Sequence, residues 1–487
     1  MDKLFDLAVI GGGINGAGIA RDAAGRGLSV VLVEAGDYGG ATSAASSKLL
    51  HGGLRYLEFG EYRLVRTALQ ERRRLIDAAP HLAHPQSFVL PRGLDSRPAW
   101  KTRAGLFLYD HLGPRGGMPA TRAIELVTDR AGRGLDPALQ QAWRYWDGAI
   151  DDSRMVIATL RDAEQRGAVL FGHDAVISGQ AGEEGWGLTL SSGRVIHARK
   201  VVNAAGPWAE HVGRDVLGLA DAPRLRLVRG SHIVVMRPTS AEDAYILPQP
   251  DGRVVFLIPW LKRHLLIGTT EIDVASPEDT APDPAEEDYL LAAASRVLAR
   301  PLGAANIVHR FGGIRPLVLE EGVSATETSR EWRLHSHADE RVLSVIGGKI
   351  TTYRRLAEAV LAEVAPRTKP WTAGSSLPGG GFAGGRARSN HVVFVESMDR
   401  VPELWPLHDP ALVRRFLQRF GTEAVPMLGR GPGPRVGPFY EAELIHFVTH
   451  EYARTPGDVL WRRTHEGLTA TPEEVAAVER WFGFTGS

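Results

Sequence analysis

The chain has no cysteine among its 487 residues, and its formal charges sum to zero at neutral pH. The absence of cysteine excludes disulfides, thiolate metal sites and cysteine nucleophiles, and it is consistent with a reducing compartment. A zero net charge gives no electrostatic reason to expect nucleic acid as a partner. No apolar run approaches the roughly 18 residues that a spanning helix needs, so any membrane contact has to be peripheral.

Several functional patterns are missing as well. The charged start of the chain does not resemble a signal peptide, so we expect a cytoplasmic protein or one on the cytoplasmic face of the inner membrane. We find no H-E-x-x-H motif and no close His/Asp cluster, so no metal site is predicted. A serine hydrolase is not supported, since no G-x-S-x-G joins a strand to a helix. The length predicts two or three domains.

What the chain does contain, near its start, is a complete nucleotide-binding βαβ pattern. The apolar run LAVI predicts a strand, a G-x-G-x-x-G motif follows, and a second apolar run ends on an acid. Gly11 permits the tight turn, Gly13 lets backbone amides approach a pyrophosphate, and Gly16 lets helix and strand pack closely. The helix start offers unpaired N–H groups and a partial positive charge. Glu34 is expected to accept a hydrogen bond from a ribose hydroxyl.

A long loop follows the acid, and its composition favours ligand binding. The segment AGDYGGATSAASSKLLHGGLRYLE is rich in Gly and Ser and has no helical or strand periodicity. Loops of this length inside a compact domain are usually functional or disordered. The embedded Lys48, His51, Arg55 and Tyr56 favour the functional interpretation, with Lys48 and His51 shaping the loop rather than reacting.

At this point the chain resembles a known family. The segments GGGINGAGIARDAAGRG and TSAASSKLLHGGLRYLEFGEYRLV are similar to the bacterial, aerobic, FAD-dependent glycerol-3-phosphate dehydrogenases, within the glycine oxidase and D-amino-acid oxidase group of flavoproteins. The resemblance implies an α/β fold with an FAD-binding Rossmann-like domain, a substrate domain on a mixed or antiparallel sheet, and a small C-terminal helical domain. It implies oxidation of sn-glycerol 3-phosphate to dihydroxyacetone phosphate by hydride transfer to flavin N5, with electrons passing to a membrane quinone.

The domain limits follow from element patterns combined with that resemblance. We expect an FAD-binding domain of residues 1–80, 150–228 and 305–369, and a substrate domain of residues 81–149 and 229–304. Residues 370–388 are dense in Gly and Ser and predict a linker. Residues 389–487 are expected to form the C-terminal domain. Helical periodicity predicts helices over 62–79 and 286–298, and a helix N-cap at Asp152 or Ser153.

The resemblance also implies which residues hold the cofactor. A second glycine turn, GGKITTY, precedes a helix that runs to about residue 364, and its amides form a positive helix end. In the family this end faces the pyrimidine side of the flavin, where reduction places negative charge. The expected FAD contacts are Gly11, Gly13, Ile14, Asn15, Gly16, Glu34, Ala35, Thr42, Ser43, Ser47, Lys48, Leu49, Gly52, Val176, Gly206, Gly348, Lys349, Ile350 and Thr351.

The substrate chemistry sets a second group of residues. A phosphate favours arginine forks, and alcohol oxidation needs a base with positive charge beside the developing alkoxide. The family motifs place the phosphate at Arg55, Tyr56 and Arg330. They place Arg315 and Lys349 at the glycerol oxygens, with Thr270 in the same site. His232 is the expected base, and water is the alternative if Arg315 or Lys349 lowers the pKa of the alcohol.

Other functions stay open on the sequence alone. An oxidase would pass electrons to O2, a relative would oxidise another 2-hydroxy acid or an amine, and a flavin-binding sensor would show no turnover. Basic and aromatic residues between 91 and 112 could form a membrane-surface patch or cover a core element. The three arginines at 72–74 are expected on a solvated helix face. A homodimer is also possible.

Overall fold

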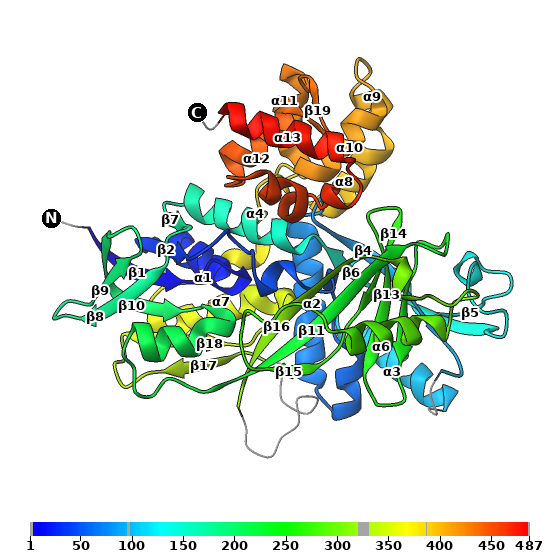
Figure 1. Ribbon diagram of the computed structural model, residues 1–487, viewed down its shortest axis with the longest axis horizontal. Coiled ribbons are helices and arrows are strands. Elements are labelled where there is room, and N and C mark those ends of the chain that lie inside the picture. The colour runs from blue at the N-terminus through cyan, green and yellow to red at the C-terminus, as the bar shows by residue number, and fades with distance from the viewer. Residues whose placement is uncertain (1–2, 95–97, 320–330, 386, 486–487) are drawn as a thin grey trace.

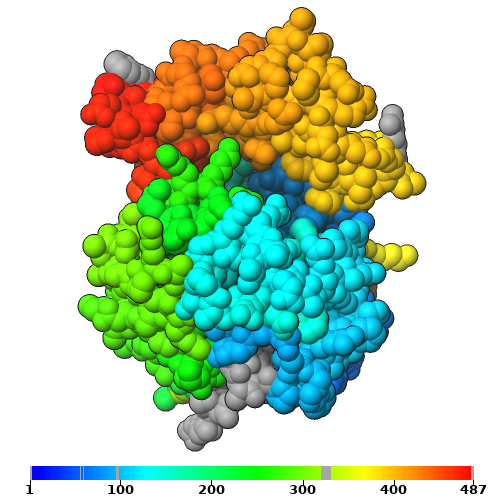
Figure 2. Space-filling model, turned by 90° about the vertical axis from the view of Figure 1, so that its right-hand side faces the viewer, coloured from blue at the N-terminus to red at the C-terminus, as the bar shows by residue number. Residues whose placement is uncertain are grey.

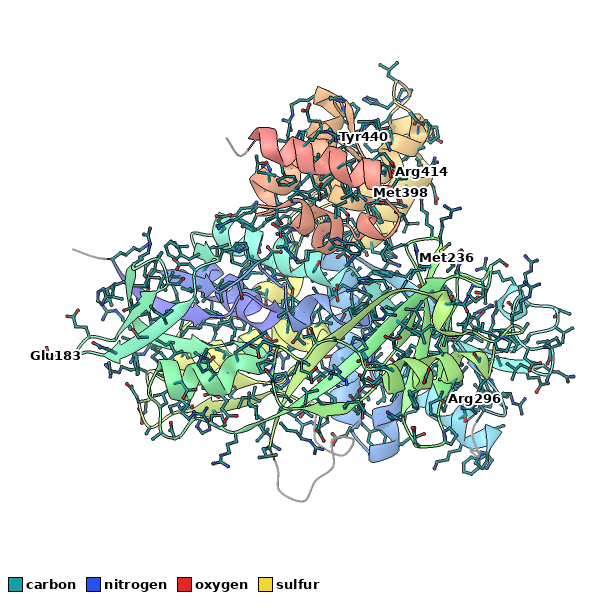
Figure 3. All side chains as sticks on the ribbon, viewed as in Figure 1. Glu183, Met236, Arg296, Met398, Arg414 and Tyr440 are labelled. Atoms are coloured by element: carbon teal, nitrogen blue, oxygen red, sulfur yellow. The ribbon has the colours of Figure 1, made fainter. Side chains whose placement is uncertain are left out.

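The computed structural model describes residues 3–94, 98–319, 331–385 and 387–485. They form two large sheets side by side, with a helical lobe seated above them (Figure 1). Glu183, in a hairpin turn of the first sheet, and Arg296, after a helix that covers the second, mark well-separated parts of this two-sheet body (Figure 3). The predicted α/β fold class is confirmed.

The first sheet has the order β17-β18-β10-β1-β2-β7, and the strands from β18 to β7 run parallel. Apolar residues alternate between its faces: Leu7 and Val9 pack on one side, and Ala8 and Ile10 on the other. The strands are β1 (Leu4–Ile10), β2 (Val30–Glu34), β7 (Val169–Gly172), β10 (Val195–Asn203), β17 (Arg333–Ser336) and β18 (Val342–Ile346).

Helices cover one face of this sheet and a hairpin extends it. The covering helices are α1 (Ile14–Gly25), α4 (Asp152–Gln165) and α7 (Tyr353–Val364). The hairpin consists of β8 (Val176–Ala181) and β9 (Trp186–Leu190), and β9 pairs with β10 through the predicted turn. The N-cap of α4 is Asp151, one residue before our prediction, and its side chain accepts from the amide of Arg154. The carboxylate of Asp152 instead pairs with Lys48.

The second sheet is mixed and mainly antiparallel, with the order β15-β11-β14-β13-β12-β4-β6-β3. Helix α6 (Pro284–Ser295) packs on one face, and α2 (Tyr62–Ala78) and α3 (Ala99–Leu112) on the other. The strands are β3 (Leu49–Leu50), β4 (Ala83–Pro91), β5 (Arg122–Glu125), β6 (Gln141–Ile150), β11 (Leu225–Met236), β12 (Ala244–Pro248), β13 (Val254–Trp260), β14 (His264–Gly268), β15 (Ile272–Val274) and β16 (Ile307–Val318).

Three expectations need correction here. Strand β16 pairs with β11 over most of its length, so residues 307–318 lie in the second sheet rather than with the nucleotide-binding strands. Arg72 is not on a solvated face, because its guanidinium is buried and donates to Asp147 at 2.8 Å. Residues 370–388 pack against the body instead of hanging free: Leu377 is buried, and its amide donates to the carbonyl of Ala78. The remaining domain limits stay a prediction.

The C-terminal lobe has its own apolar core and appears as a separate mass above the sheets (Figure 2). Its helices are α8 (Asn390–Asp399), α9 (Val401–Leu404), α10 (Pro410–Phe420), α11 (Ala424–Arg430), α12 (Glu441–His450) and α13 (Pro472–Thr485). A short hairpin joins β19 (Arg435–Val436) to β20 (Phe439–Tyr440).

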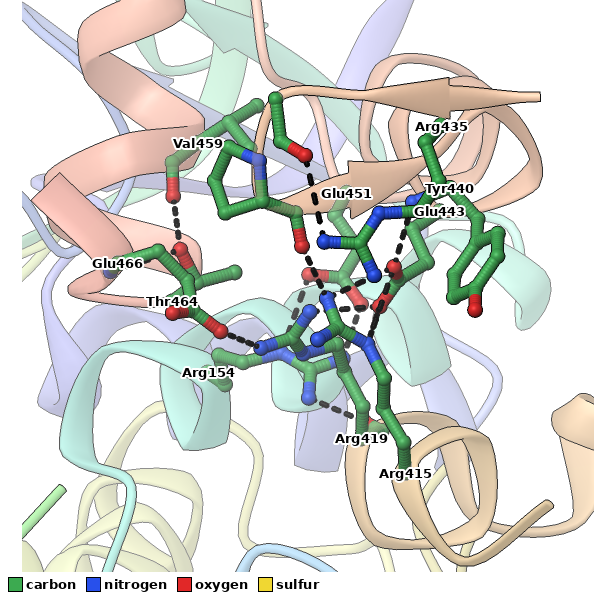
Figure 4. A network of polar contacts seen from close by, with 12 residues as sticks. Arg154, Arg415, Arg419, Arg435, Tyr440, Glu443, Glu451, Val459, Thr464 and Glu466 are labelled. Carbon is green, nitrogen blue, oxygen red and sulfur yellow. Dashed lines mark hydrogen bonds and ion pairs between the residues drawn. The ribbon is translucent and has the colours of Figure 1, made fainter. Parts of the chain in front are cut away.

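Buried ion pairs fix this lobe to the first sheet and its helices. Arg154 of α4 pairs with Glu451 and also donates to the carbonyl oxygen of Arg419, at the centre of a polar network (Figure 4). Arg463 reaches the loop after β2, where it donates to Asp37 at 2.7 Å. Because removing one partner of a buried pair is costly, these contacts hold the lobe in a defined position.

Candidate active site

The first glycine turn joins β1 to α1, and its N-cap residue, Gly13, has no side chain to cap the helix. Gly11 has a φ of +107°, which favours glycine, and a Cβ on Gly16 would overlap the carbonyl oxygen of Gly11. The hydroxyl of Ser43 accepts from the amide of Ile14 at 3.0 Å. Gly13 precedes α1, so the positive end of a helix of 12 residues faces the loop that carries Ser43.

Glu34 ends β2 beside this turn, where the sequence predicts a ribose contact. Its carboxylate accepts from the amide of Gly12 at 2.6 Å and from the amide of Gly36 at 2.8 Å. Ala35 is the residue between Glu34 and Gly36 in the chain. The acid therefore fixes the loops after β1 and β2 relative to each other.

The second glycine turn lies against the first. Gly347 and Gly348 have φ values of +73° and +94°, and they follow the end of β18. The side-chain amide of Asn15 donates to the carbonyl oxygen of Gly347 at 3.0 Å, while its Oδ1 is buried with no partner among the described residues. Lys349, Ile350 and Thr351 follow and lead through a short 3-10 turn into α7.

Most of the predicted cofactor residues follow the carboxyl ends of the parallel strands. Gly206 comes just after β10, and Val176 comes shortly after β7. In open α/β sheets this edge is where nucleotides bind. Leu49 and Gly52 differ, because Leu49 pairs with β6 of the second sheet and the amide of Gly52 donates to the hydroxyl of Tyr109.

The loop from Thr42 to Lys48 connects the two sheets. The hydroxyl of Thr42 donates to the carbonyl of Ile314 at 2.7 Å. Lys48 is buried and lies 2.8 Å from both carboxylate oxygens of Asp152. The hydroxyl of Ser47 lies 2.8 Å from Nε2 of His232. These contacts connect the nucleotide-binding end of the first sheet to strands β11 and β16 of the second sheet.

His232 lies in the middle of the second sheet, on β11. It is opposite Gly268 of β14 and Phe311 of β16, and its ring stacks on Phe311 with centroids 4.9 Å apart. A Cβ on Gly268 would overlap the imidazole, so glycine is required there. Burial, together with the charges of Arg315 and Lys48, lowers the pKa of His232 to about 3. The ring is therefore neutral at neutral pH, as a proton acceptor must be.

Arg315 reaches the same place from β16. It pairs with Val228, two residues along β11 from Gly230 and four from His232. These positions share one face of the strand. A Cβ on Gly230 would lie 2.5 Å from Nη2 of Arg315, so the glycine gives the guanidinium room to cross the strand towards His232. Nη2 donates to the hydroxyl of Thr269 at 3.3 Å.

Both side chains carry a buried nitrogen with no partner among the described residues. These atoms are Nδ1 of His232 and Nη1 of Arg315. Burial lowers the pKa of Arg315 below its ordinary value, although an arginine stays protonated. A buried donor without a partner is costly, so a bound ligand that accepts from Nη1 would satisfy it.

Of the other predicted substrate residues, the structure brings some together and places one away from His232. The ammonium of Lys349 lies 3.9 Å from the ring centroid of Tyr56, which joins the second glycine turn to the 3-10 segment of residues 54–59. The side chain of Arg55 and all of Arg330 lie outside the described residues. The hydroxyl of Thr270 donates to Glu286 at 2.6 Å and accepts from the amide of Ser231, a neighbour of His232 that faces the other side of β11. This placement does not support a catalytic role for Thr270.

An open cavity of about 310 Å³ adjoins this site. Its wall contains Thr42 and Lys48 from the connecting loop, and Phe311, the ring that stacks on His232. Trp461 and His465 from the C-terminal lobe complete it: Trp461 stacks on His309 at 5.1 Å and His465 lies against Trp260 at 4.9 Å. The lobe thus contributes directly to the surroundings of the site.

Sequence reasoning missed several of these residues. The sequence motif predicted Thr270 rather than Thr269. Only the side of the chain to which each residue points distinguishes the two, since Thr269 contacts Arg315 and Thr270 contacts Glu286. Phe311, Trp461 and Asp152 lie near the site through tertiary packing, which leaves no local pattern in the sequence. Gly230 and Gly268 gave a weak signal, because glycine inside an apolar strand often marks a close approach of another group.

The nucleotide side fits FAD. The glycines at 11 and 16 hold the turn open where any Cβ would clash, Gly13 at the N-cap of α1 has no side chain to fill the helix start, and Oδ1 of Asn15 is buried without a partner among the described residues. A pyrophosphate at the helix start and a polar ring edge near Asn15 would match these features.

Comparison with known proteins agrees with this geometry. Residues 6–354 match the family model described as FAD dependent oxidoreductase. The chain is 39% identical to the aerobic glycerol-3-phosphate dehydrogenase of Escherichia coli K12, covering 98% of this chain and 97% of that protein. It is also 39% identical to the D-erythritol 1-phosphate dehydrogenase of Brucella abortus, with the same coverage. The glycerol-3-phosphate dehydrogenase of Bacillus halodurans, solved with FAD, superposes with a TM-score of 0.72 at 24% identity, over 99% of this chain and 94% of that one.

Proposed function

This chain belongs to the FAD-dependent oxidoreductase family, and we propose that it oxidises sn-glycerol 3-phosphate to dihydroxyacetone phosphate. One observation carries the proposal: neutral His232 and cationic Arg315 meet on adjacent strands, each with a buried nitrogen that has no partner among the described residues. An alcohol losing its proton needs an acceptor on one side and positive charge on the other. This pair supplies both.

The roles of the residues follow from their contacts. When Nε2–H of His232 donates to Ser47, Nδ1 keeps a lone pair that accepts the hydroxyl proton. Arg315 stabilises the developing alkoxide, and Lys349 adds a second positive charge from the glycine turn. Bound FAD supplies the hydride acceptor at N5 of its isoalloxazine ring. The C2 hydrogen leaves with its electron pair, the hydroxyl proton goes to the base, and the C–O bond becomes a carbonyl.

The phosphate is the second feature of the substrate. We assign it to Arg55, Tyr56 and Arg330, as the family motifs imply. Tyr56 lies beside Lys349, so a phosphate there would be close to the glycine turn. Thr269, which accepts from Arg315, belongs with Arg315 and Lys349 at the glycerol oxygens, in place of Thr270.

D-erythritol 1-phosphate is the second candidate substrate, because a dehydrogenase of that compound matches this chain with the same identity and coverage. The two compounds share a phosphorylated polyol and differ in chain length. Comparing kcat/KM for both substrates tests the choice. We expect a higher kcat/KM for glycerol 3-phosphate. A higher kcat/KM for D-erythritol 1-phosphate would identify that compound as the substrate instead.

We further propose that a membrane quinone accepts the electrons. The cavity beside Phe311 supports this, since Trp260, Trp461 and His465 give it flat aromatic walls suited to a planar ring. The variant W461A should raise KM for a soluble quinone analogue while leaving anaerobic flavin reduction by substrate unchanged. Hydrogen peroxide formed in amounts equal to substrate oxidised would indicate an oxidase instead.

Membrane contact would then be peripheral. Among the described residues, no helix combines the length and apolar character needed to cross a bilayer. Trp100 and Phe107 of α3 are 72% and 64% exposed, lie seven residues apart on one helix face, and have exposed Lys101 and Arg103 nearby. We propose that this face binds anionic lipid at the cytoplasmic side of the inner membrane. Flotation with anionic vesicles should fall for W100A/F107A. A homodimer stays a prediction for light scattering to test.

A further inference from the structure

We propose that Asp221, His335 and His337 form a binding site for one divalent transition-metal ion of the zinc type. One ligand atom from each side chain can be chosen so that all three lie within 4.8 Å of one another. These residues belong to neither glycine turn nor to the His232 and Arg315 pair, so the proposal does not depend on the substrate. The two histidines are only two residues apart, but Asp221 lies 116 residues before His337, so the set of three ligands does not form a local sequence motif.

The two histidines are brought together by strand geometry. His335 lies on β17, the edge strand of the first sheet, opposite Ser344 of β18. His337 follows two residues later, and its amide still donates to the carbonyl oxygen of Val342. Residues two apart on an extended chain share a face, so both rings project to the same side. Their centroids are 4.6 Å apart.

Asp221 meets these rings from the loop between residues 217 and 224, which leads into β11. Its Oδ1 lies 2.6 Å from Nδ1 of His337, and its Oδ2 lies 4.0 Å from Nε2 of His335. Two imidazole nitrogens and one carboxylate oxygen are the usual ligands of Zn²⁺, with water as a fourth. Small side-chain shifts would bring each atom to the roughly 2.0–2.2 Å of a coordination bond.

The surroundings orient the ligands as they do in known metal sites. The other ring nitrogen of His337, Nε2, lies 2.8 Å from the hydroxyl of Ser344. The amide of Ala338 donates to Oδ2 of Asp221 at 2.7 Å. Such outer contacts fix the ring orientation and the carboxylate of a metal site. The His337 side chain is fully buried, whereas His335 and Asp221 are 36% and 39% exposed, so an ion can enter from solvent.

A plain hydrogen-bonded Asp–His pair would explain His337 but not His335. Nε2 of His335 is buried and has no hydrogen-bond partner among the described residues, although it points towards the same carboxylate. A cation shared by the three groups would satisfy this nitrogen. It would also join the edge strand β17 to the loop before β11, and so stabilise the connection between the two sheets.

The test uses the full-length, flavin-loaded chain without a histidine tag. After treatment with a chelator, the protein is dialysed against increasing Zn²⁺ and the bound metal is counted by mass spectrometry. We expect one ion per chain and a rise in Tm with Zn²⁺. The variant H335A should bind at least about tenfold more weakly and lose the rise in Tm.

The matched control is H211A. His211 lies 2.8 Å from Asp215 on the surface, in an Asp–His pair for which no third ligand is found among the described residues. The H211A variant should bind Zn²⁺ as tightly as the unmodified chain does. If H335A has the flavin spectrum and the metal-free Tm of the unmodified chain, the variant is folded. If H335A does not fold, H335Q is used in its place. Equal Zn²⁺ binding by the unmodified chain and H335A, or no bound ion in either, would overturn the proposal.

Discussion

The side-chain amide of Asn15 donates a hydrogen bond of 3.0 Å to the carbonyl oxygen of Gly347, which lies 332 residues further along the chain. This contact joins the turn after β1 to the turn after β18. Asn15 is in the first turn of α1, while Gly347 leads into α7, so the bond sets the distance between two positive helix ends. The expected cofactor site is therefore built from the first and the last parallel strands of the first sheet along the chain.

Removing this bond should weaken FAD binding. Replacing Asn15 with Ala leaves the carbonyl of Gly347 unpaired and frees the second turn. One hydrogen bond in a partly buried site contributes about 1–1.5 kcal/mol, so the FAD dissociation constant should rise about tenfold. Flavin fluorescence during dilution measures it. The control N306A removes an exposed asparagine whose contact is with Gly303, and an equal loss in both variants would refute the role of Asn15.

The substitution G16A should abolish FAD binding. The added Cβ would overlap the carbonyl oxygen of Gly11, and neither backbone segment can shift without opening the turn. The purified variant is expected to be colourless. The control G429A, in helix α11, adds a Cβ with no atom of the described residues within 4 Å and should keep its flavin. A yellow G16A protein would contradict the tight packing of Gly16 against the carbonyl of Gly11.

The first βαβ unit could be predicted almost completely from the sequence. Its signals are local: glycine spacing, two apolar runs and a terminal acid all lie within residues 7–34. Helix α2 was also predictable from its periodicity and from the proline after it. These features do not depend on distant parts of the chain, which is why pattern reasoning succeeds for them.

The substrate side was harder because its geometry depends on register. Thr269 and Thr270 are neighbours, yet one accepts from Arg315 and the other donates to buried Glu286. A one-residue difference along an extended chain exchanges the two faces of a sheet. Sequence alone also gave no sign that Arg72 of helix α2 would be buried against Asp147, since that partner lies on strand β6, 75 residues further along the chain.

Arg315 should not tolerate lysine. Lysine has a single donor nitrogen, so it cannot reproduce the two separated nitrogens of the guanidinium, of which Nη2 contacts Thr269 while Nη1 is left for a substrate oxygen. Losing such a charge-assisted bond costs about 2–3 kcal/mol, so kcat/KM should fall about 30- to 150-fold in R315K. Steady-state assays with a dye acceptor measure this. R310K, on the same strand but at an exposed ion pair with Glu287, should behave like the unmodified enzyme.

His232 should control the chemical step more than binding. In H232Q the side chain can still hydrogen-bond but cannot take a proton at neutral pH. Anaerobic flavin reduction at saturating substrate should slow by about 10²-fold or more, with little change in substrate affinity. Stopped-flow absorbance separates the two quantities. A reduction rate within a factor of a few of the unmodified enzyme would favour water as the base.

The lowered pKa of His232 has a consequence for stability. The folded ring has a pKa of about 3, whereas an unfolded histidine titrates near about 6.5. Between these values the unfolded chain binds a proton that the folded chain does not, so this contribution to stability is present above pH 6.5 and declines as the pH falls towards 3. Relative to H232Q, the unfolding free energy should fall by up to about 1.4 kcal/mol per pH unit in that window. Urea titrations across pH would show it, and parallel profiles would contradict it.

The most direct measurement is anaerobic mixing of the purified yellow protein with sn-glycerol 3-phosphate while the flavin absorbance is recorded. We expect this compound to bleach the flavin at low concentration, and glycerol, which lacks the phosphate, to leave it oxidised. Bleaching by glycerol and the phosphate ester alike, or by an amino acid alone, would contradict this expectation.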